Sequence, residues 1–226
     1  GVPFHSASIY IQRLVAKGYK VAICEQLEDA KEAKGLVDRG VIKVVTPGTV
    51  TDENMLDERK NNYLCVLYRG SSTALAFCDI STGAFFVTVC ADAPSAVSEL
   101  GRFAPTEIIR GGENVYSELF EDTLLRRLNC CVDEGKQDDF DLEHSESLLE
   151  NHFGKDLAEL GLSGLPAAII AAGALLQTLL TLQKNDLAHI RTLQYYTTGR
   201  FMELDMDARR NLELAETMRT KEKKGS

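Results

Sequence analysis

The sequence predicts an α/β protein in which a mixed sheet with flanking helices follows a small, incomplete α/β unit. Three apolar, strand-like runs lie at short spacing between residues 63 and 90, and alternating helix and strand patterns follow up to residue 154. A long uncharged helix pattern begins at Pro166. The length of 226 residues is enough for two domains, and a hydrophobic content of 44% is ordinary for a globular protein.

The first 46 residues predict one helix and two strands in a β-α-β-like remnant. An apolar stripe from Ile9 to Val15 indicates a helix, which Ser6 or Ser8 can cap and Gly18 can end. The strands are expected in "YKVAIC" (19–24) and "VIKVVT" (41–46), with a charged loop or short helical turn at 28–37 between them. One helix and two strands are too few to be expected to form a hydrophobic core of their own. The Pro-Gly and charged residues of 47–62 then mark a boundary.

Three strands, expected at 63–68, 73–80 and 84–90, form an antiparallel meander because Gly, Ser and Thr separate them. The elements expected next are a short helix at 95–103, a strand at 105–110, an amphipathic helix at 115–128, a strand at 130–132, an acidic loop, and a helix from 145 closed by Gly154. This order is typical of a ribonuclease H-like domain, although a fold order alone indicates no activity.

The helix from Pro166 to about Gln183 approaches membrane-spanning length, but three polar side chains interrupt it, so a buried helix is expected and no membrane association. A strand at 200–205 and a helix at 206–219 are expected after it.

Charge is uneven along the chain, which has a net charge of −9. Residues 1–60 are neutral, residues 61–165 carry 7 basic against 18 acidic residues, and residues 166–226 carry 9 against 7. The acidic middle repels a phosphate backbone, so only the ends are expected to approach nucleic acid. None of the six cysteines forms a C-x-x-C pair, and the four histidines are scattered, which predicts a reducing cytoplasm and no metal site.

The stretch "FCDISTGAFF" (77–86) is the main candidate for chemistry, since the chain carries no nucleotide-binding glycine loop and no nucleophile elbow. Asp79 and Glu107, on strands that could be neighbours, could serve a metal-dependent nuclease of ribonuclease H-like fold, with the acidic loop 138–143 lending a third carboxylate. Against this, the first strand of the meander carries no acid. The alternative is a hairpin turn, in which Asp79 accepts N–H groups from Ser81 or Thr82 and Gly83 permits the reversal.

Stretches along the whole chain resemble, in order, the MutS family of bacterial DNA mismatch-repair proteins. "GVPFH", "VAICEQ" and "VTPGT" are similar to the end of the family's mismatch-recognition domain, "AFCDISTGAF" resembles a turn of its connector domain, and "MDARRNLEL" resembles the opening of its core domain. The resemblance implies a recognition-domain remnant (1–46), a linker (47–60), a ribonuclease H-like connector (61–165), and a connecting helix with the start of the α-helical core (166–226).

The family implies a clamp-like homodimer that scans mismatched duplex DNA, with ATP and Mg²⁺ as its switch. Its mismatch-wedging motif lies upstream of these segments and its ATPase downstream. The resemblance therefore implies a non-catalytic cytoplasmic fragment without a cofactor of its own, whose connector relays conformational signals and docks the partner protein MutL.

Residue roles follow from the same resemblance. Arg39 matches a basic residue that approaches the DNA minor groove, a role that suits arginine. Lys43 could contact phosphate, and His5 ends the "GVPFH" signature. Arg39 and Lys43 could equally be solvated surface charges, and His5 could equally cap a helix or pack against the protein. The MutL-docking surface corresponds to the helix around Ser147, Leu148 and Glu150.

Overall fold

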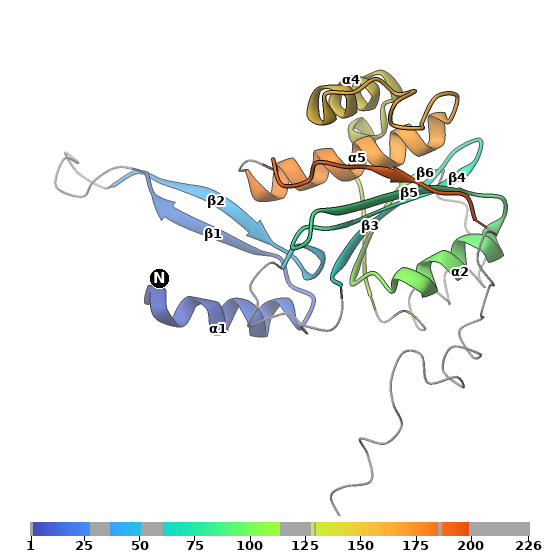
Figure 1. The fold of residues 1–226 in the computed structure, drawn as a ribbon. Helices are drawn as coiled ribbons and strands as arrows, with labels where there is room; N and C mark the ends of the chain where they lie inside the picture. Colours follow the sequence, from blue (N-terminus) through green and yellow to red (C-terminus); the bar gives the residue numbers. More distant parts are fainter. Residues whose placement is uncertain are drawn as a thin grey trace, which may run out of the picture.

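The computed structural model describes residues 2–27, 37–50, 61–113, 128, 130–184 and 187–198. Within these residues a small unit of one helix and one hairpin stands beside a larger unit built on a six-stranded sheet (Figure 1). We call residues 2–50 the hairpin unit and the larger one the connector. The α/β class with a mixed sheet is therefore confirmed.

The helix of the hairpin unit, α1 (Phe4–Val15), packs Ile11 and Val15 on the hairpin, whereas Ile9 and Leu14 of the predicted stripe are exposed. Val15, Val45 and Val50 are buried between them. The predicted serine cap is wrong: α1 begins after Pro3, and no side chain caps it. The fixed φ of proline suits the start of a helix, which places Ser6 and Ser8 inside the first turns.

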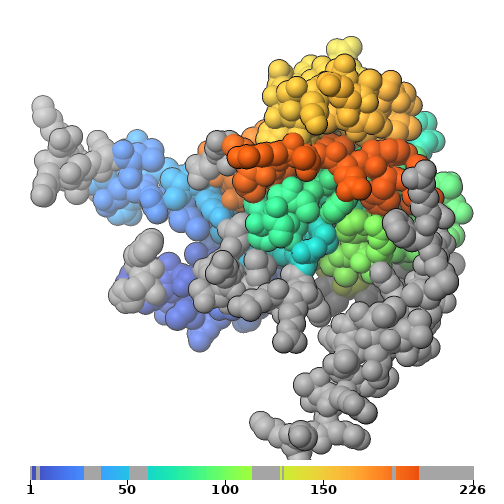
Figure 2. All heavy atoms as spheres, in the orientation of Figure 1, coloured from blue at the N-terminus to red at the C-terminus, as the bar shows by residue number. Residues whose placement is uncertain are grey.

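The two strands of the hairpin unit, β1 (Val21–Gln26) and β2 (Arg39–Val45), pair antiparallel. The β-α-β-like prediction is therefore wrong, because that unit requires parallel strands. The N–H of Leu27 donates to the carbonyl of Asp38 at 3.0 Å, which carries the ladder beyond the two strands. The hairpin projects to one side of the connector (Figure 2).

The sheet of the connector has the strand order β7-β6-β3-β4-β5-β8. The predicted antiparallel meander is confirmed as β3 (Tyr63–Arg69), β4 (Thr73–Asp79) and β5 (Ala84–Cys90). On one side, β6 (Glu107–Gly112) pairs parallel to β3, and β7 (Cys131–Glu134) pairs parallel to β6. On the other side, β8 (Gln194–Tyr195) pairs parallel to β5.

Helices cover both faces of this sheet because its apolar residues point to both sides. In β3, Leu64 and Val66 face a large apolar cluster beneath α5 (Pro166–Gln183), whereas Cys65 and Leu67 face α2 (Ala93–Phe103). The helix α4 (Leu142–Phe153) lies on the outer side of α5 (Figure 1). A short 3-10 helix, η3 (Gln137–Phe140), leads into it.

The prediction of a buried helix from Pro166 to Gln183 is confirmed. By length and composition α5 could cross a membrane, but 67% of the helix is buried inside the protein. In α4 the closing Gly154 is confirmed, while the start lies three residues earlier than predicted, because Asp141 rather than Ser145 caps it.

Some predicted elements lie outside the described residues: the charged loop or helical turn at 28–37, apart from Val37, the helix at 115–128, apart from Leu128, and the strand and helix between 200 and 219. The two-residue strand β8 was not predicted.

Candidate functional site: the hairpin and its junction with the connector

The two predicted DNA-contacting side chains on the hairpin differ in exposure. Arg39 is the first residue of β2, pairs with Gln26 and is exposed at the outer end of the ladder. Lys43 pairs with Ile23 and is half-buried. The Arg39 N–H donates to the carboxylate of Asp38 at 2.9 Å, so the turn into β2 carries an acid next to the arginine.

His5 lies in the first turn of α1, a different element from the β2 strand that carries Arg39 and Lys43, and its side chain is outside what the structure describes. The segment 2–24 nevertheless contains no acidic residue. Its three basic side chains, Arg13, Lys17 and Lys20, are exposed. Lys20 is paired with the carboxylates of Glu107 and Asp133, and Arg13 and Lys17 are the other exposed basic side chains of this segment.

The predicted docking residues lie on α4. Ser147 and Glu150 are exposed, whereas Leu148 is partly buried and packs on the core beneath α5. The Glu150 carboxylate also accepts the N–H of Leu157 at 3.3 Å. The exposed side of α4 thus offers polar groups, with Leu148 at its margin.

Asp79 ends β4, is only 1% exposed and acts as a turn residue. One carboxylate oxygen accepts the N–H of Ser81 at 2.9 Å and its hydroxyl at 2.6 Å. The other accepts the N–H of Asn62 at 3.2 Å. Gly83 follows with φ +74°. The predicted Asx-type turn is confirmed, with an additional bond to Asn62 that the sequence did not indicate.

Glu107 begins β6 and is fully buried. One carboxylate oxygen accepts the N–H of Gly48 at 3.0 Å. The other lies 3.4 Å from Nζ of Lys20, an ion pair without the geometry of a good hydrogen bond. Both partners of Glu107 belong to the hairpin unit, so this carboxylate connects the two units.

The Pro47–Gly48 peptide, at the start of the 3-10 helix η1 (Pro47–Thr49), is held at both of its polar ends. Its N–H donates to Glu107, and its carbonyl accepts the side-chain amide of Asn62 at 3.0 Å. The Thr106 hydroxyl has a single proton, and its shortest contact is with the Asn62 carbonyl oxygen at 2.7 Å. Thr106 therefore orients the amide that binds Pro47. We call Asn62, Thr106, Glu107 and this peptide the junction cluster.

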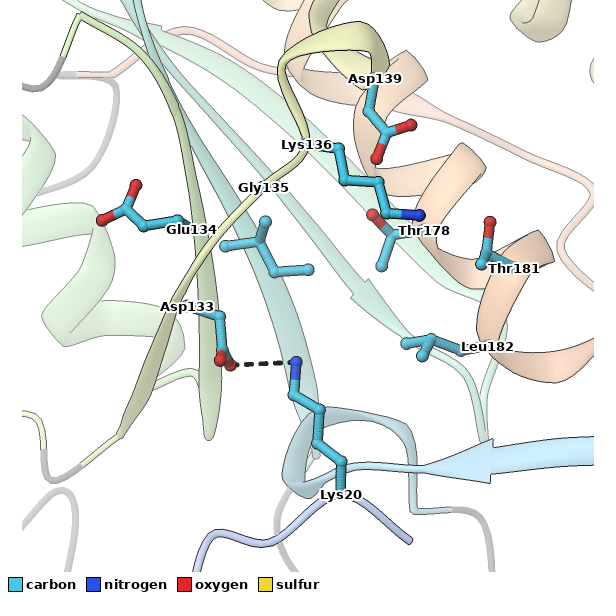
Figure 3. A pocket seen from close by; sticks show the side chains of 10 residues that line it. Lys20, Asp133, Glu134, Gly135, Lys136, Asp139, Thr178, Thr181 and Leu182 are labelled. Atoms are coloured by element: carbon cyan, nitrogen blue, oxygen red, sulfur yellow. Dashed lines mark ion pairs between the residues drawn. The ribbon is translucent and has the colours of Figure 1, made fainter. Parts of the chain in front are cut away.

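Lys20 closes the junction from the other side. Its Nζ lies 3.2 Å from the Asp133 carboxylate (Figure 3). The same atom is 3.4 Å from Glu107. Burial alone would lower the pKa of Lys20, but the two carboxylates outweigh it and raise the pKa above its ordinary value. A pocket of about 160 Å³ lies beside this ion pair, lined by Lys20, residues of β7 and the Thr178 and Thr181 side of α5.

The nuclease hypothesis has no support in this geometry. β4 and β6 both pair with β3 and not with each other, so Asp79 and Glu107 are not on neighbouring strands as predicted. Each carboxylate is occupied by backbone N–H groups of its own surroundings. Among the described residues, no group of three or more His, Cys, Asp or Glu side chains could hold a metal ion.

Sequence reasoning missed most of the junction. It treated the Pro-Gly dipeptide only as a boundary signal and assigned no role to Lys20, Asn62 or Thr106. The available signal was the placement of a Pro-Gly pair after the β-branched run of β2, since glycine allows a close backbone approach.

Comparisons with known proteins agree with this division. The family model for MutS domain I matches residues 1–54, and the model for MutS domain II matches residues 62–191. The chain is 48% identical over its whole length to the DNA mismatch repair protein MutS of Ruminiclostridium cellulolyticum, covering 26% of that protein. It is 45% identical over its whole length to that of Acetivibrio thermocellus, covering 26%, and 42% identical over 97% of its length to that of Methanococcoides burtonii, covering 25%. The chain thus spans about a quarter of the length of these relatives.

Proposed function

The chain belongs to the MutS family of DNA mismatch repair proteins, and we propose that it supplies that repair system with a DNA-facing hairpin on a non-catalytic connector. The observation that carries the proposal is the pairing of the two matches with two structural units. The domain I match covers the hairpin unit with its exposed Arg39, and the domain II match covers the sheet.

The connector is proposed to be a ribonuclease H-like domain. Three strands in antiparallel order, β5-β4-β3, continue into the parallel strands β6 and β7, and helices pack on both faces. This arrangement supports the assignment. The domain boundaries remain those of the resemblance, namely 1–46, 47–60, 61–165 and 166–226, except that the packing of α5 on the sheet favours counting this helix with the connector.

DNA contact by the hairpin is tested by measuring the binding of the 226-residue chain to duplex DNA over a range of salt concentrations. We expect weak, salt-sensitive binding without preference for a mismatch. Arg39→Ala should weaken binding, and Lys43→Ala should reduce the salt slope by about one, the contribution of a single phosphate contact. Lys155→Ala, an equal charge change on the connector, is the matched control. Equal losses in all three variants would contradict the hairpin as the contact surface.

The docking of MutL is proposed for the exposed side of α4, where Ser147 and Glu150 point outward beside Leu148. A pull-down with MutL tests it, since Ser147→Arg places a long charged side chain on that surface. We expect Ser147→Arg to lose MutL and Arg13→Glu, on the hairpin unit, to retain it. The reverse result would place the docking surface elsewhere.

The remaining properties are proposed for the longer family protein: ATP and Mg²⁺ as its switch, homodimer formation, action on mismatched duplex DNA and a cytoplasmic location. The connector would relay conformational signals between the ATP switch of that longer protein and the hairpin.

A further inference from the structure

We propose that the junction cluster is a positioning device, which fixes the direction in which the hairpin leaves the connector. Its consequence for DNA rests on the proposed function, whereas the positioning itself concerns only the chain's own residues. The cluster joins the connector to the hairpin unit through Glu107 and Asn62, which bind the two ends of one peptide.

The geometry restrains orientation as well as distance. A single hydrogen bond lets a peptide plane rotate about the bond, but the Pro47–Gly48 plane is held at its N–H by Glu107 and at its carbonyl by Asn62. Lys20 adds a further point of attachment, from the segment between α1 and β1. These attachments reach the hairpin unit at two places, the Pro47–Gly48 peptide and Lys20, which restrains its direction more than either place alone.

Apolar packing does not provide this restraint. Among the described residues, the buried cluster of the hairpin unit contains Val15, Val45 and Val50, while both clusters of the connector begin at β3. None of these three clusters crosses the junction. Contacts of α5 with β2, and of η1 with β3 and β6, also join the two units, but apolar contacts are non-directional. Directional bonds at the junction are what a fixed angle requires.

The chemistry at position 107 favours positioning over plain stability. Burying a carboxylate costs desolvation energy, and a buried ion pair often adds no more stability than a well-packed apolar residue would. Ile108 and Ile109 continue β6 as ordinary core residues. A fully buried glutamate beside them has a clear role if it holds its partners in one arrangement. Any other arrangement would leave its charge buried and unpaired, which is costly.

Gly48 completes the device through its small size. A Cβ atom at this position would lie 3.0 Å from Cβ of Glu107 and 3.0 Å from Cδ1 of Leu64. An added Cβ is therefore tighter than an ordinary contact, so it strains the approach of the peptide to the carboxylate, whose Oε2 would lie 3.1 Å away. This makes Gly48→Ala a second perturbation of the cluster, one that keeps every polar side chain in place.

Residual dipolar couplings of backbone N–H groups in the 226-residue chain test the proposal. In the unmodified chain, one alignment tensor should fit both the hairpin unit and the connector. In Glu107→Ala and in Gly48→Ala, couplings of the hairpin unit should fall by about a third or more relative to the connector, as expected for a mobile unit. Circular dichroism establishes that each variant is folded. Glu107→Gln, which keeps the side-chain shape, should give a smaller change.

The matched control is Glu99→Gln, which removes a carboxylate that is 6% exposed and bonded to Arg102 and Tyr196, away from the junction. It should leave the common tensor unchanged. A common tensor in both Glu107→Ala and Gly48→Ala, or an equal effect of Glu99→Gln, would overturn the positioning role. Loss of the common tensor supports it even if Arg39→Ala leaves DNA binding unchanged, because that result would refute only the DNA assignment.

Discussion

Replacing Asp79 by alanine is expected to destabilise the connector by about 2–4 kcal/mol, chiefly through one buried backbone group. Losing the three hydrogen bonds of the carboxylate would not cost the same amount of free energy in each case. Ser81 is exposed, so water can replace the carboxylate at its N–H and hydroxyl. Asn62 is 7% exposed, so its N–H would be left buried without an acceptor. An unsatisfied buried donor costs about 1–3 kcal/mol, and loss of a charged acceptor adds to it.

Urea unfolding at neutral pH, followed by far-UV circular dichroism, measures this change. Asp79→Asn should cost less, about 1–2 kcal/mol, because its amide oxygen can still accept from Ser81. Asp92→Ala is the control: Asp92 caps α2 through the N–H of Ser95 but is exposed. We expect a smaller effect there. A change below about 0.5 kcal/mol for Asp79→Ala, the level of ordinary surface substitutions, would refute the turn-and-anchor role.

Three further outcomes are expected. Burial raises the pKa of Cys90 to about 12 and that of Cys130 to about 11, from an ordinary 9.0. As the pH rises, the unfolded chain therefore loses these thiol protons before the folded chain does. The stability contributed by the two thiols is full below pH 9 and is lost as the pH rises toward 12. The urea midpoint should accordingly be constant near neutral pH and fall above pH 9. Alkylation followed by mass spectrometry at pH 8 should modify the exposed Cys24 well before the buried Cys65, whose thiol has a raised pKa; equal rates would contradict the burial. Tyr196→Phe removes the hydroxyl that donates to Glu99 at 2.7 Å and should cost about 1 kcal/mol in urea unfolding, since Arg102 still pairs with that carboxylate; no measurable change would mean that the bond contributes nothing.

The connector was predicted better from the sequence than the hairpin unit, because the residue patterns that define its elements lie close together along the chain. Strands β3 to β5 follow one another through short turns, so pattern and turn chemistry agree. The helix α5 was predicted at both ends, since Pro166 opens it and a long apolar run follows. The antiparallel pairing of β1 with β2 was not predicted, because no residue pattern between the two strands indicated a hairpin. The two-residue β8 is too short for any periodic signal.

The junction could not be predicted because its partners are distant in sequence. Gly48 and Glu107 are 59 residues apart, and Asn62 and Thr106 are 44 apart. A buried glutamate is read from sequence as a candidate acid, and only the strand order shows that Glu107 and Asp79 lie on either side of β3. Arg39, Ser147, Leu148 and Glu150 came from the family resemblance, and their roles stay predictions.

The short strand β8 has a consequence for biosynthesis. β5 is the edge of the meander until β8 pairs with it, and the Thr88 hydroxyl bonds the carbonyl of Tyr196, 108 residues further along the chain. A growing chain therefore carries an open, largely apolar strand edge until most of the connector has been made. Such edges pair readily with other chains, so chaperone occupancy on the ribosome should persist until residue 196 has emerged.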